Sequence, residues 1–183
     1  MQEKRGKMRV GIISDTHKKV GRAKKAIDLL VDKGIEFLIH AGDIVKEEIL
    51  EYIESKNLRY VAVLGNNDYH LYSVVDKYEL VTEPFYFKLA GKTWKLMHYP
   101  KYIFPLDTDI IVYGHTHEVD ITFNGKNLIL NPGEVCARDT GFSSCMTLDI
   151  KKDKYVVTLF YRKIKTTEWK SKVKEFFISG GKE

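Results

Sequence analysis

The first third of the chain alternates short apolar runs with amphipathic stretches. Three of the runs have the length of a buried strand, at residues 8–13, 37–39 and 60–64. Between them, apolar side chains recur at helical spacing in residues 26–31, ahead of Gly34, and in residues 44–53. A β-α-β-α-β order of this kind predicts parallel strands joined by right-handed crossovers.

The second half of the chain predicts antiparallel pairing instead. Apolar runs are joined there by short turn-like segments, pairing 85–89 with 93–97, 119–123 with 128–130, and 145–150 with 155–161. The Asn124-Gly125 pair is a strong hairpin signal, and residues 110–113 form a further apolar run. Two mixed sheets packed face to face, with helices outside, accommodate both the parallel strands of the first part and the antiparallel pairs of the second. We therefore expect an α/β fold of four layers, αββα.

The length of 183 residues suits one domain, which we place at residues 8–183 after an N-terminal extension of residues 1–7. Near the C-terminus, four apolar side chains recur at positions i, i+4, i+7 and i+8: Trp169, Val173, Phe176 and Phe177. This spacing predicts a short amphipathic helix that packs on the domain or forms a homodimer contact.

The composition is that of a globular protein, with 44% hydrophobic and 30% charged residues. We expect no membrane association, because no apolar run approaches the ~20 residues of a spanning helix. The N-terminus lacks the apolar core of a secretory signal, and two cysteines without a CxxC pair indicate a cytoplasmic protein. Residues 1–9 and 162–174 carry much of the net charge of +5. We interpret them as solvated faces, with nucleic-acid binding as the less favoured alternative.

Polar side chains that can bind metals follow five of the predicted strands. Because ligands bind at the C-terminal ends of parallel strands, we expect these side chains to converge. The spacings Asp-x-His and His-x-His let two donors face the same way at a strand end. Carboxylate, amide and imidazole donors without a thiolate suit a divalent ion better than a structural zinc site. The candidates are Asp15, His17, Asp43, Asn66, Asp68, His98, His115 and His117.

Taken together, these motifs resemble the calcineurin-like metallophosphoesterase family over residues 8 to about 161. The segment Asn131-Pro132-Gly133-Glu134 is similar to the small bacterial and archaeal phosphodiesterases of that family, near which the retromer scaffold subunit also belongs. The resemblance implies a β-sandwich flanked by helices that holds two divalent ions. Manganese is the first expectation, with nickel, cobalt, zinc, iron or magnesium as alternatives. One ion is assigned to Asp15, His17 and His117, the other to Asn66, His98 and His115, and both to Asp43.

The resemblance also implies a reaction. We expect a metal-dependent phosphodiesterase that hydrolyses a small phosphate ester through in-line attack of a hydroxide shared by two ions. Its catalytic residues would be Asp43, Asn66, His98 and Asp68, with Asp68 orienting Asn66 or a ligand histidine. Phosphomonoesterase or nucleotidase activity is one alternative, and a non-catalytic metal-binding interaction scaffold is another.

Two positions depart from the family pattern. Many relatives have a histidine that protonates the leaving group where this chain has Asn67, and an amide is no general acid near neutral pH. We therefore expect good leaving groups to be preferred unless His70 substitutes, although a surface histidine is the plainer interpretation. The second departure is Tyr99-Pro100 after His98, where relatives commonly have glycine. We interpret the aromatic side chains there as packing residues rather than a substrate wall, namely Tyr99, Tyr102 and Phe104.

Three further residues near the motifs receive weaker interpretations. We expect His40 to be a buried histidine whose hydrogen bonds are satisfied within the fold. Arg138 is a minor candidate for a contact with a substrate phosphate. Cys136 is expected near the pocket without a chemical role.

Overall fold

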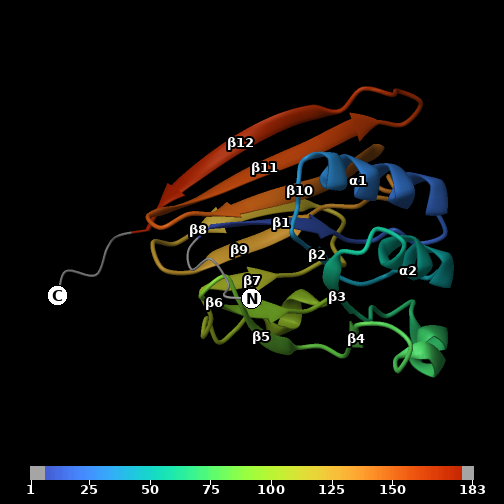
Figure 1. Cartoon of the computed structure of the whole chain (residues 1–183), viewed down its shortest axis with the longest axis horizontal. Helices are drawn as coiled ribbons and strands as arrows, with labels where there is room; N and C mark the ends of the chain where they lie inside the picture. Colours follow the sequence, from blue (N-terminus) through green and yellow to red (C-terminus); the bar gives the residue numbers. More distant parts are fainter. Residues whose placement is uncertain (1–6, 179–183) are drawn as a thin grey trace.

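Two mixed β-sheets pack face to face in the computed structural model, which describes residues 7–178 (Figure 1). The larger sheet has seven strands in the order β12-β11-β10-β1-β2-β3-β4. Strands β1 to β4 run parallel to one another, whereas β10, β11 and β12 are antiparallel to their neighbours. The bounds are β1 Met8–Ile13, β2 Phe37–His40, β3 Arg59–Val63, β4 Leu80–Val81, β10 Phe142–Ile150, β11 Lys154–Lys163 and β12 Lys170–Phe177.

The smaller sheet has five strands in the order β5-β6-β7-β9-β8. Two predicted hairpins form its edges, β5 with β6 and β8 with β9, while β7 runs parallel to both β6 and β9. The bounds are β5 Phe85–Leu89, β6 Lys92–Leu96, β7 Ile110–Val112, β8 Val119–Phe123 and β9 Leu128–Pro132. The carboxyl ends of β6 and β7 therefore point the same way.

Apolar side chains from the inner faces of both sheets form one core. Ile12 and Ile39 of the larger sheet belong to the same buried cluster as Trp94 and Leu96 of the smaller one. The outer face of the larger sheet is covered by helices α1 (Val20–Asp32) and α2 (Glu47–Glu54) (Figure 1). This packing confirms the expected α/β sandwich of two mixed sheets.

The outer face of the smaller sheet is covered by a loop in place of a long helix. Met97 and Ile111 lie buried there against Tyr102, Ile103 and other side chains of the segment around the short 3₁₀ helix η2 (Pro100–Tyr102). The fourth layer of the sandwich is therefore thin. Among residues 7–178, no helix combines the length and the apolar character needed to cross a membrane.

The predicted amphipathic helix at the C-terminus is wrong, because this segment forms strand β12. It pairs antiparallel with β11 from Lys170, opposite Tyr161, to Phe177, opposite Lys154. Pairing with β11 provides hydrogen-bond partners for the backbone N–H and C=O groups of the segment. Phe176 packs against Phe123 of β8, with ring centroids 5.4 Å apart. The lysines of β12 occupy every second position, which is the period of a strand.

Candidate metal centre

The seven predicted donors converge at the carboxyl ends of β1, β2, β3, β6 and β7. A first group forms around Asp15 Oδ1, which lies 3.0 Å from His117 Nε2 and 3.8 Å from His17 Nε2. The two imidazole nitrogens are 3.4 Å apart, and His17 Nε2 is 3.6 Å from Asp43 Oδ2. Four side chains from three loops therefore aim their donor atoms at one point.

A second group forms around the amide oxygen of Asn66. His98 Nε2 lies 3.0 Å from Asn66 Oδ1, and His115 Nδ1 lies 3.2 Å from the same oxygen. His98 Nε2 is also 3.5 Å from Asp43 Oδ1. Asp43 thus presents one carboxylate oxygen to each group, an arrangement that fits the shared role implied by the family resemblance.

The donor set fits a pair of divalent cations. Two donors that are each about 2.1 Å from one ion lie about 3.0–3.4 Å apart, which matches the shorter contacts within each group. Asp15 and Asp43 are buried, and within residues 7–178 no Lys or Arg forms an ion pair with either. Asp15 Oδ1 accepts no hydrogen bond from the described residues. Buried carboxylates without a cation are costly, so a divalent cation held by these residues would offset that cost.

The backbone of the site is left-handed at most of the candidate donors. Positive φ angles occur at five of the seven: Asp15 (52°), His17 (44°), Asp43 (54°), His115 (69°) and His117 (62°). This region is uncommon for residues other than glycine, and its clustering is typical of functional sites. The loops therefore turn sharply after each strand. The turn after β1 aims Asp15 and His17 at the first group, whereas the turn after β7 aims His117 at the first group and His115 at the second.

Close backbone approach at the centre requires glycine at two positions. A Cβ on Gly65 would collide with the backbone nitrogen and Oδ1 of Asp43, and a Cβ on Gly114 would collide with Ser14 Oγ. The loops after β1, β2, β3 and β7 consequently pack directly against one another. Gly65 lets two neighbouring loops of the larger sheet approach each other, and Gly114 lets the loop after β7 of the smaller sheet reach the same centre.

Hydrogen bonds fix the orientation of two candidate histidine ligands. His98 Nδ1 lies 2.8 Å from the carbonyl oxygen of Ala41, so this nitrogen is the donor and Nε2 faces the centre. His117 Nδ1 lies 2.8 Å from Glu134 Oε2, which leaves His117 Nε2 to face Asp15. Partners of this kind set the tautomer and the ring orientation of histidine ligands.

Glu134 is a functional residue whose role sequence reasoning missed. Its side chain is buried, and its carboxylate collects the bond from His117 together with bonds from Cys136 Sγ and from the backbone of residues 138–140. Burial alone would raise the pKa of Glu134, but these hydrogen bonds lower it to about 2. The only signal in the sequence is the segment Asn131-Pro132-Gly133-Glu134, which indicates the family branch but not the contact with His117.

Asp68 occupies the site in a different way from the one predicted. It was expected to orient Asn66 or a histidine, but its carboxylate accepts hydrogen bonds from the backbone N–H groups of Ile44, Val45 and Gly65 at 3.1, 2.7 and 2.8 Å. Burial raises the pKa of Asp68, while these three bonds oppose the rise. Asp68 therefore ties the loop of Asp43 to the loop of Asn66 through their backbones.

Asn67 binds the shared carboxylate. Its side-chain amide donates to Asp43 Oδ2 at 2.7 Å, and its backbone N–H donates to Asp43 Oδ1 at 2.9 Å. Burial opposes ionisation of Asp43, but His98 and Asn67 together hold its pKa well below the usual range. His70 is exposed, and its Nε2 donates to the carbonyl oxygen of Val45 at 2.6 Å. That contact agrees with the interpretation of His70 as a surface residue.

Both ring nitrogens of His40, a buried histidine outside the donor set, have hydrogen-bond partners, as predicted. His40 Nε2 contacts Thr16 Oγ1 at 3.0 Å, and His40 Nδ1 accepts a hydrogen bond from the backbone of Gly42 at 3.2 Å. Burial lowers the pKa of His40 to about 3, so this ring is neutral. Through these two contacts, His40 holds the loop after β2 against the loop after β1.

The aromatic residues after His98 divide between packing and exposure. Tyr102 packs against the buried Met97 cluster, and the Tyr99 ring lies 4.2 Å from that of His115. Phe104 is 77% exposed, so its predicted packing role is wrong. The loop contributes one ring to the wall of the centre and leaves another in solvent.

Cys136 and Arg138 both lie beside the centre. Sγ of Cys136 donates to Glu134, and burial raises the pKa of this thiol to about 12, which keeps it protonated. The Arg138 guanidinium donates to Asp139 at 3.0 Å, and one of its nitrogens lies 3.5 Å from His117 Nε2. Arg138 is therefore within reach of an anion held at the centre.

A model of the calcineurin-like phosphoesterase superfamily domain matches residues 8–153, well over half of the chain. The chain belongs to this superfamily. Phosphodiesterase MJ0936 of Methanocaldococcus jannaschii is 28% identical over 160 residues, which cover 81% of this chain and 96% of that protein. As a member of the superfamily the chain is a metallophosphoesterase, and membership implies divalent metal ions.

Solved structures agree with this assignment. Vacuolar protein sorting 29 from Cryptosporidium parvum superposes with a TM-score of 0.76 at 20% identity, covering 94% of this chain and 99% of that one, which shows a shared fold. A structure described as a novel archaeal phosphodiesterase superposes with a TM-score of 0.67 at 25% identity, covering 91% of this chain and 99% of that one. The superfamily fold therefore extends over nearly the whole chain.

Proposed function

We propose that this metallophosphoesterase is a phosphodiesterase that uses two divalent ions, with manganese the first candidate. The observation that carries the proposal is the pair of donor groups joined by Asp43, whose two carboxylate oxygens face different groups. Similarity to the archaeal phosphodiesterases supports the choice of diesters over monoesters. When bound, two such ions polarise phosphoryl oxygens and lower the pKa of water.

The residues of the chain have distinct roles in this proposal. Asp15, His17 and His117 would hold one ion, and Asn66, His98 and His115 the other, with Asp43 shared. His98 must release a proton to serve, since burial alone would lower its pKa but the neighbouring Asp43 raises it to about 8. Glu134 and Asp68 position the donors through His117 and through the backbone, respectively.

Protonation of the leaving group is the weak step. The side-chain amide of Asn67 donates a hydrogen bond to Asp43, and an amide cannot act as a general acid near neutral pH. The His70 ring donates to the carbonyl oxygen of Val45. General acid catalysis is typically worth about 10²–10⁴-fold, so substrates with poor leaving groups should react correspondingly slowly. We therefore propose that diesters with good leaving groups are hydrolysed faster than diesters, such as those of nucleotides, whose alkoxide leaving group must gain a proton.

A non-catalytic scaffold is the second candidate, favoured by the fold shared with vacuolar protein sorting 29. A scaffold needs no complete donor set, whereas this chain has a metal-binding side chain at each of the seven positions. The enzyme is therefore the better supported proposal.

The test is hydrolysis by metal-free protein reloaded in turn with Mn, Ni, Co, Zn or Mg. We expect bis-p-nitrophenyl phosphate to be cleaved faster than p-nitrophenyl phosphate. Asp43→Asn should lower kcat by at least about 10³-fold, because it removes several kcal/mol of transition-state stabilisation. The matched control is Asp76→Asn, an exposed aspartate distant from the donors, which should change nothing. Inactivity with all five metals would favour the scaffold.

A further inference from the structure

One hollow adjoins the candidate metal centre and a second lies beside the first, and cationic side chains line both. The first has a volume of about 590 Å³ and is bounded by His17 and Asn67. The second, of about 550 Å³, lies between the first turn of α1 and residues 162–167, which comprise the end of β11 and the loop after it. The hollows share Lys18 and Lys19, so they form one continuous surface that begins at the donors. Within the described chain, neither hollow is lined by an Asp or Glu.

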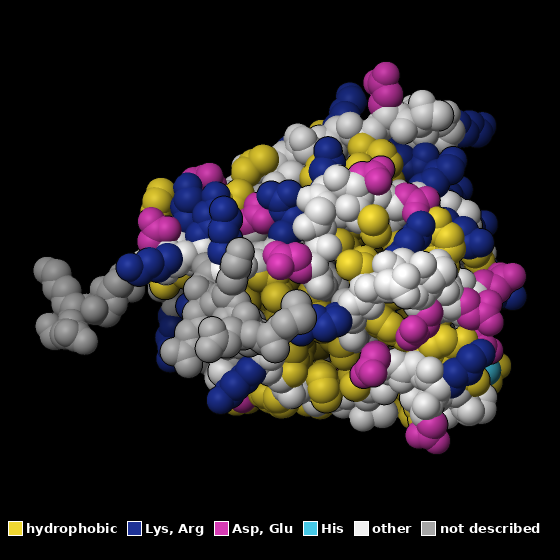
Figure 2. All heavy atoms as spheres, viewed as in Figure 1, with side chains coloured by type: hydrophobic (Ala, Val, Ile, Leu, Met, Phe, Trp, Pro, Cys, Tyr) yellow, Lys and Arg dark blue, Asp and Glu magenta, His cyan; other side chains and the backbone are white. Residues whose placement is uncertain are grey.

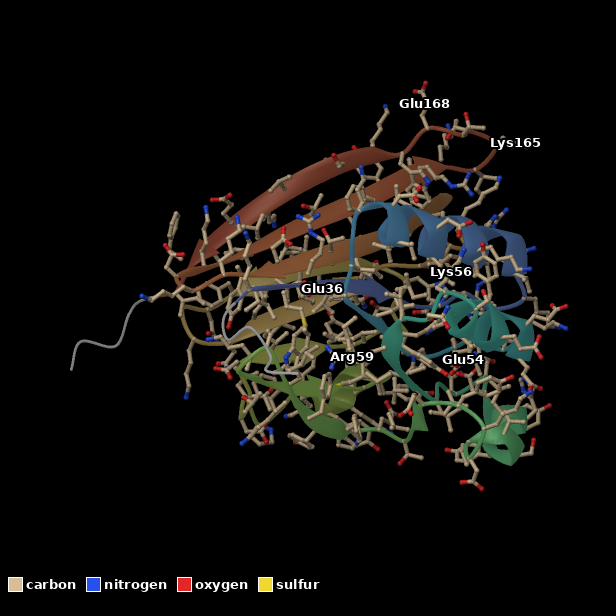
Figure 3. All side chains as sticks on the ribbon, viewed as in Figure 1. Glu36, Glu54, Lys56, Arg59, Lys165 and Glu168 are labelled. Atoms are coloured by element: carbon tan, nitrogen blue, oxygen red, sulfur yellow. The ribbon has the colours of Figure 1, made fainter. Side chains whose placement is uncertain are left out.

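The second hollow gathers basic residues from segments that are far apart in the sequence. Figure 2 shows Lys and Arg side chains grouped between the N-terminal end of α1 and the loop that joins β11 to β12. Lys165 lies on that loop, at the end of the molecule where β1, β2 and β3 terminate (Figure 3). In addition to the shared lysines, the basic lining consists of Arg22, Lys25, Arg162, Lys163 and Lys165.

Two buried polar groups in the lining of the second hollow lack partners within residues 7–178. Arg162 is only 8% exposed, and Nη1 donates to the carbonyl oxygen of Thr166 at 2.9 Å, but Nε has no acceptor. Ser143 is 2% exposed, and its hydroxyl also has no partner. Buried polar groups are nearly always hydrogen-bonded, so two groups without partners in the lining of one hollow favour the binding of a polar ligand there.

The positive charge of the residues that line the second hollow favours binding of an anion. Burial lowers the pKa of Arg162, and the nearby Arg22 lowers it further. Neither guanidinium forms an ion pair with a carboxylate of the described chain, and Arg22 donates instead to the carbonyl oxygen of Cys136. The first turn of α1 lies at the same place, where Lys19 provides no side-chain cap. Uncapped N–H groups of a helix favour negative charge and bind phosphate.

We propose that the second hollow binds a phosphate of the substrate and that the substrate is a short oligonucleotide. The scissile diester would lie at the donors, and the next phosphate along the chain would lie between α1 and residues 162–167. Tyr69 lines the first hollow and is 79% exposed, so its ring can stack with a base of an oligonucleotide bound there. This inference rests on the proposed phosphodiesterase function and adds its substrate class.

The activity test compares two thymidine dinucleotides that differ only in a 5′-phosphate. Both contain one diester, but only the phosphorylated one can also occupy the second hollow. We expect kcat/KM to be at least about tenfold higher for the phosphorylated dinucleotide, the factor expected from one or two charge-assisted hydrogen bonds. Lys163→Glu should remove most of this preference, and Arg162→Gln should do the same. Lys152→Glu, an equal charge reversal in the β10–β11 turn, should retain it.

A binding test does not depend on catalysis. The Trp169 ring lies 5.1 Å from the Arg162 guanidinium, whereas the other tryptophan, Trp94, is fully buried between the sheets. Titration of the metal-free protein should therefore change the fluorescence of Trp169, with binding of the phosphorylated dinucleotide at least about tenfold tighter. Lys163→Glu should weaken this binding, and Trp169→Phe should abolish the signal.

The outcomes separate the two proposals. Equal kcat/KM and equal binding for the two dinucleotides would overturn the oligonucleotide proposal, as would a Lys163→Glu variant that keeps the full preference. Binding limited to the phosphorylated 5′ end, with no gain over thymidine 5′-monophosphate, would also contradict it, because the first hollow would then contribute nothing. Inactivity on bis-p-nitrophenyl phosphate and on both dinucleotides would reject the phosphodiesterase function. The binding titration would then show whether the second hollow still binds the 5′-phosphate.

Discussion

Replacing Glu134 with Gln should reveal how strongly the metal-free protein depends on one buried carboxylate. Burial alone would raise the pKa of Glu134, but its hydrogen bonds lower it from 4.5 to about 2. The donors include His117 Nδ1 at 2.8 Å and the backbone N–H of Thr140 at 2.6 Å. A pKa lowered from 4.5 to about 2 corresponds to about 3 kcal/mol of folding stability at neutral pH.

The sign of this contribution can be checked with pH. Because the folded pKa of Glu134 is depressed, its contribution is complete above pH 4.5 and is lost as the pH falls toward about 2. Urea denaturation of the metal-free proteins should therefore show Glu134→Gln to be about 3 kcal/mol less stable at pH 7, and only about 1–1.5 kcal/mol less stable at pH 3. Manganese should also bind at least about tenfold more weakly, since His117 loses an anionic partner.

The matched control is Glu118→Gln, which removes the same charge from an exposed side chain in the neighbouring loop. Its stability should lie within about 0.5 kcal/mol of the wild type at both pH values. A stability gap for Glu134→Gln that is equal at pH 3 and pH 7 would refute the electrostatic argument. A gap below about 1 kcal/mol at pH 7 would do the same.

Three further predictions concern the residues around the donors. Asp68→Ala should lower the free energy of unfolding by about 3 kcal/mol in chemical denaturation, because three backbone N–H groups lose their acceptor; unchanged stability would disprove the loop-tying role. Manganese affinity of the metal-free protein should fall as the pH drops below about 8, since His98 then holds a proton, and calorimetry in two buffers should detect proton release. Gly65→Ala should weaken manganese binding at least about tenfold with the fold retained by circular dichroism, because the new Cβ meets Asp43; wild-type affinity would contradict the close approach.

The candidate donors could be predicted from the sequence because each follows a strand directly. A short apolar run fixes where a strand ends, and the parallel order of the strands then fixes which ends lie together. The roles of Asp68 and Glu134 could not be found in this way. Asp68 accepts hydrogen bonds from the backbone of Ile44 and Val45, more than 20 residues away, and Glu134 contacts His117 at another strand end. Such contacts depend on how the loops pack.

The main error in the predicted secondary structure lies where the sequence carries both a helical and a strand-like periodicity. Residues 169–177 place aromatic side chains at helical spacing, but Lys170, Lys172 and Lys174 alternate as in a strand. The unpaired edge of β11 decided the outcome by supplying hydrogen bonds to the whole segment. Likewise α2 begins at Glu47 rather than at residue 44, because the backbone of Ile44 and Val45 is held by Asp68 in the loop.

The left-handed turns at five of the seven donors bear on how the protein exchanges its ions. These turns are set by the packing of neighbouring loops, so the conformational penalty is met when the chain folds and not when a cation arrives. An ion can then enter or leave without any segment having to refold around it. Such a rigid cradle would load whichever suitable cation is abundant, so the ion found in the purified protein would record the growth medium as much as the sequence.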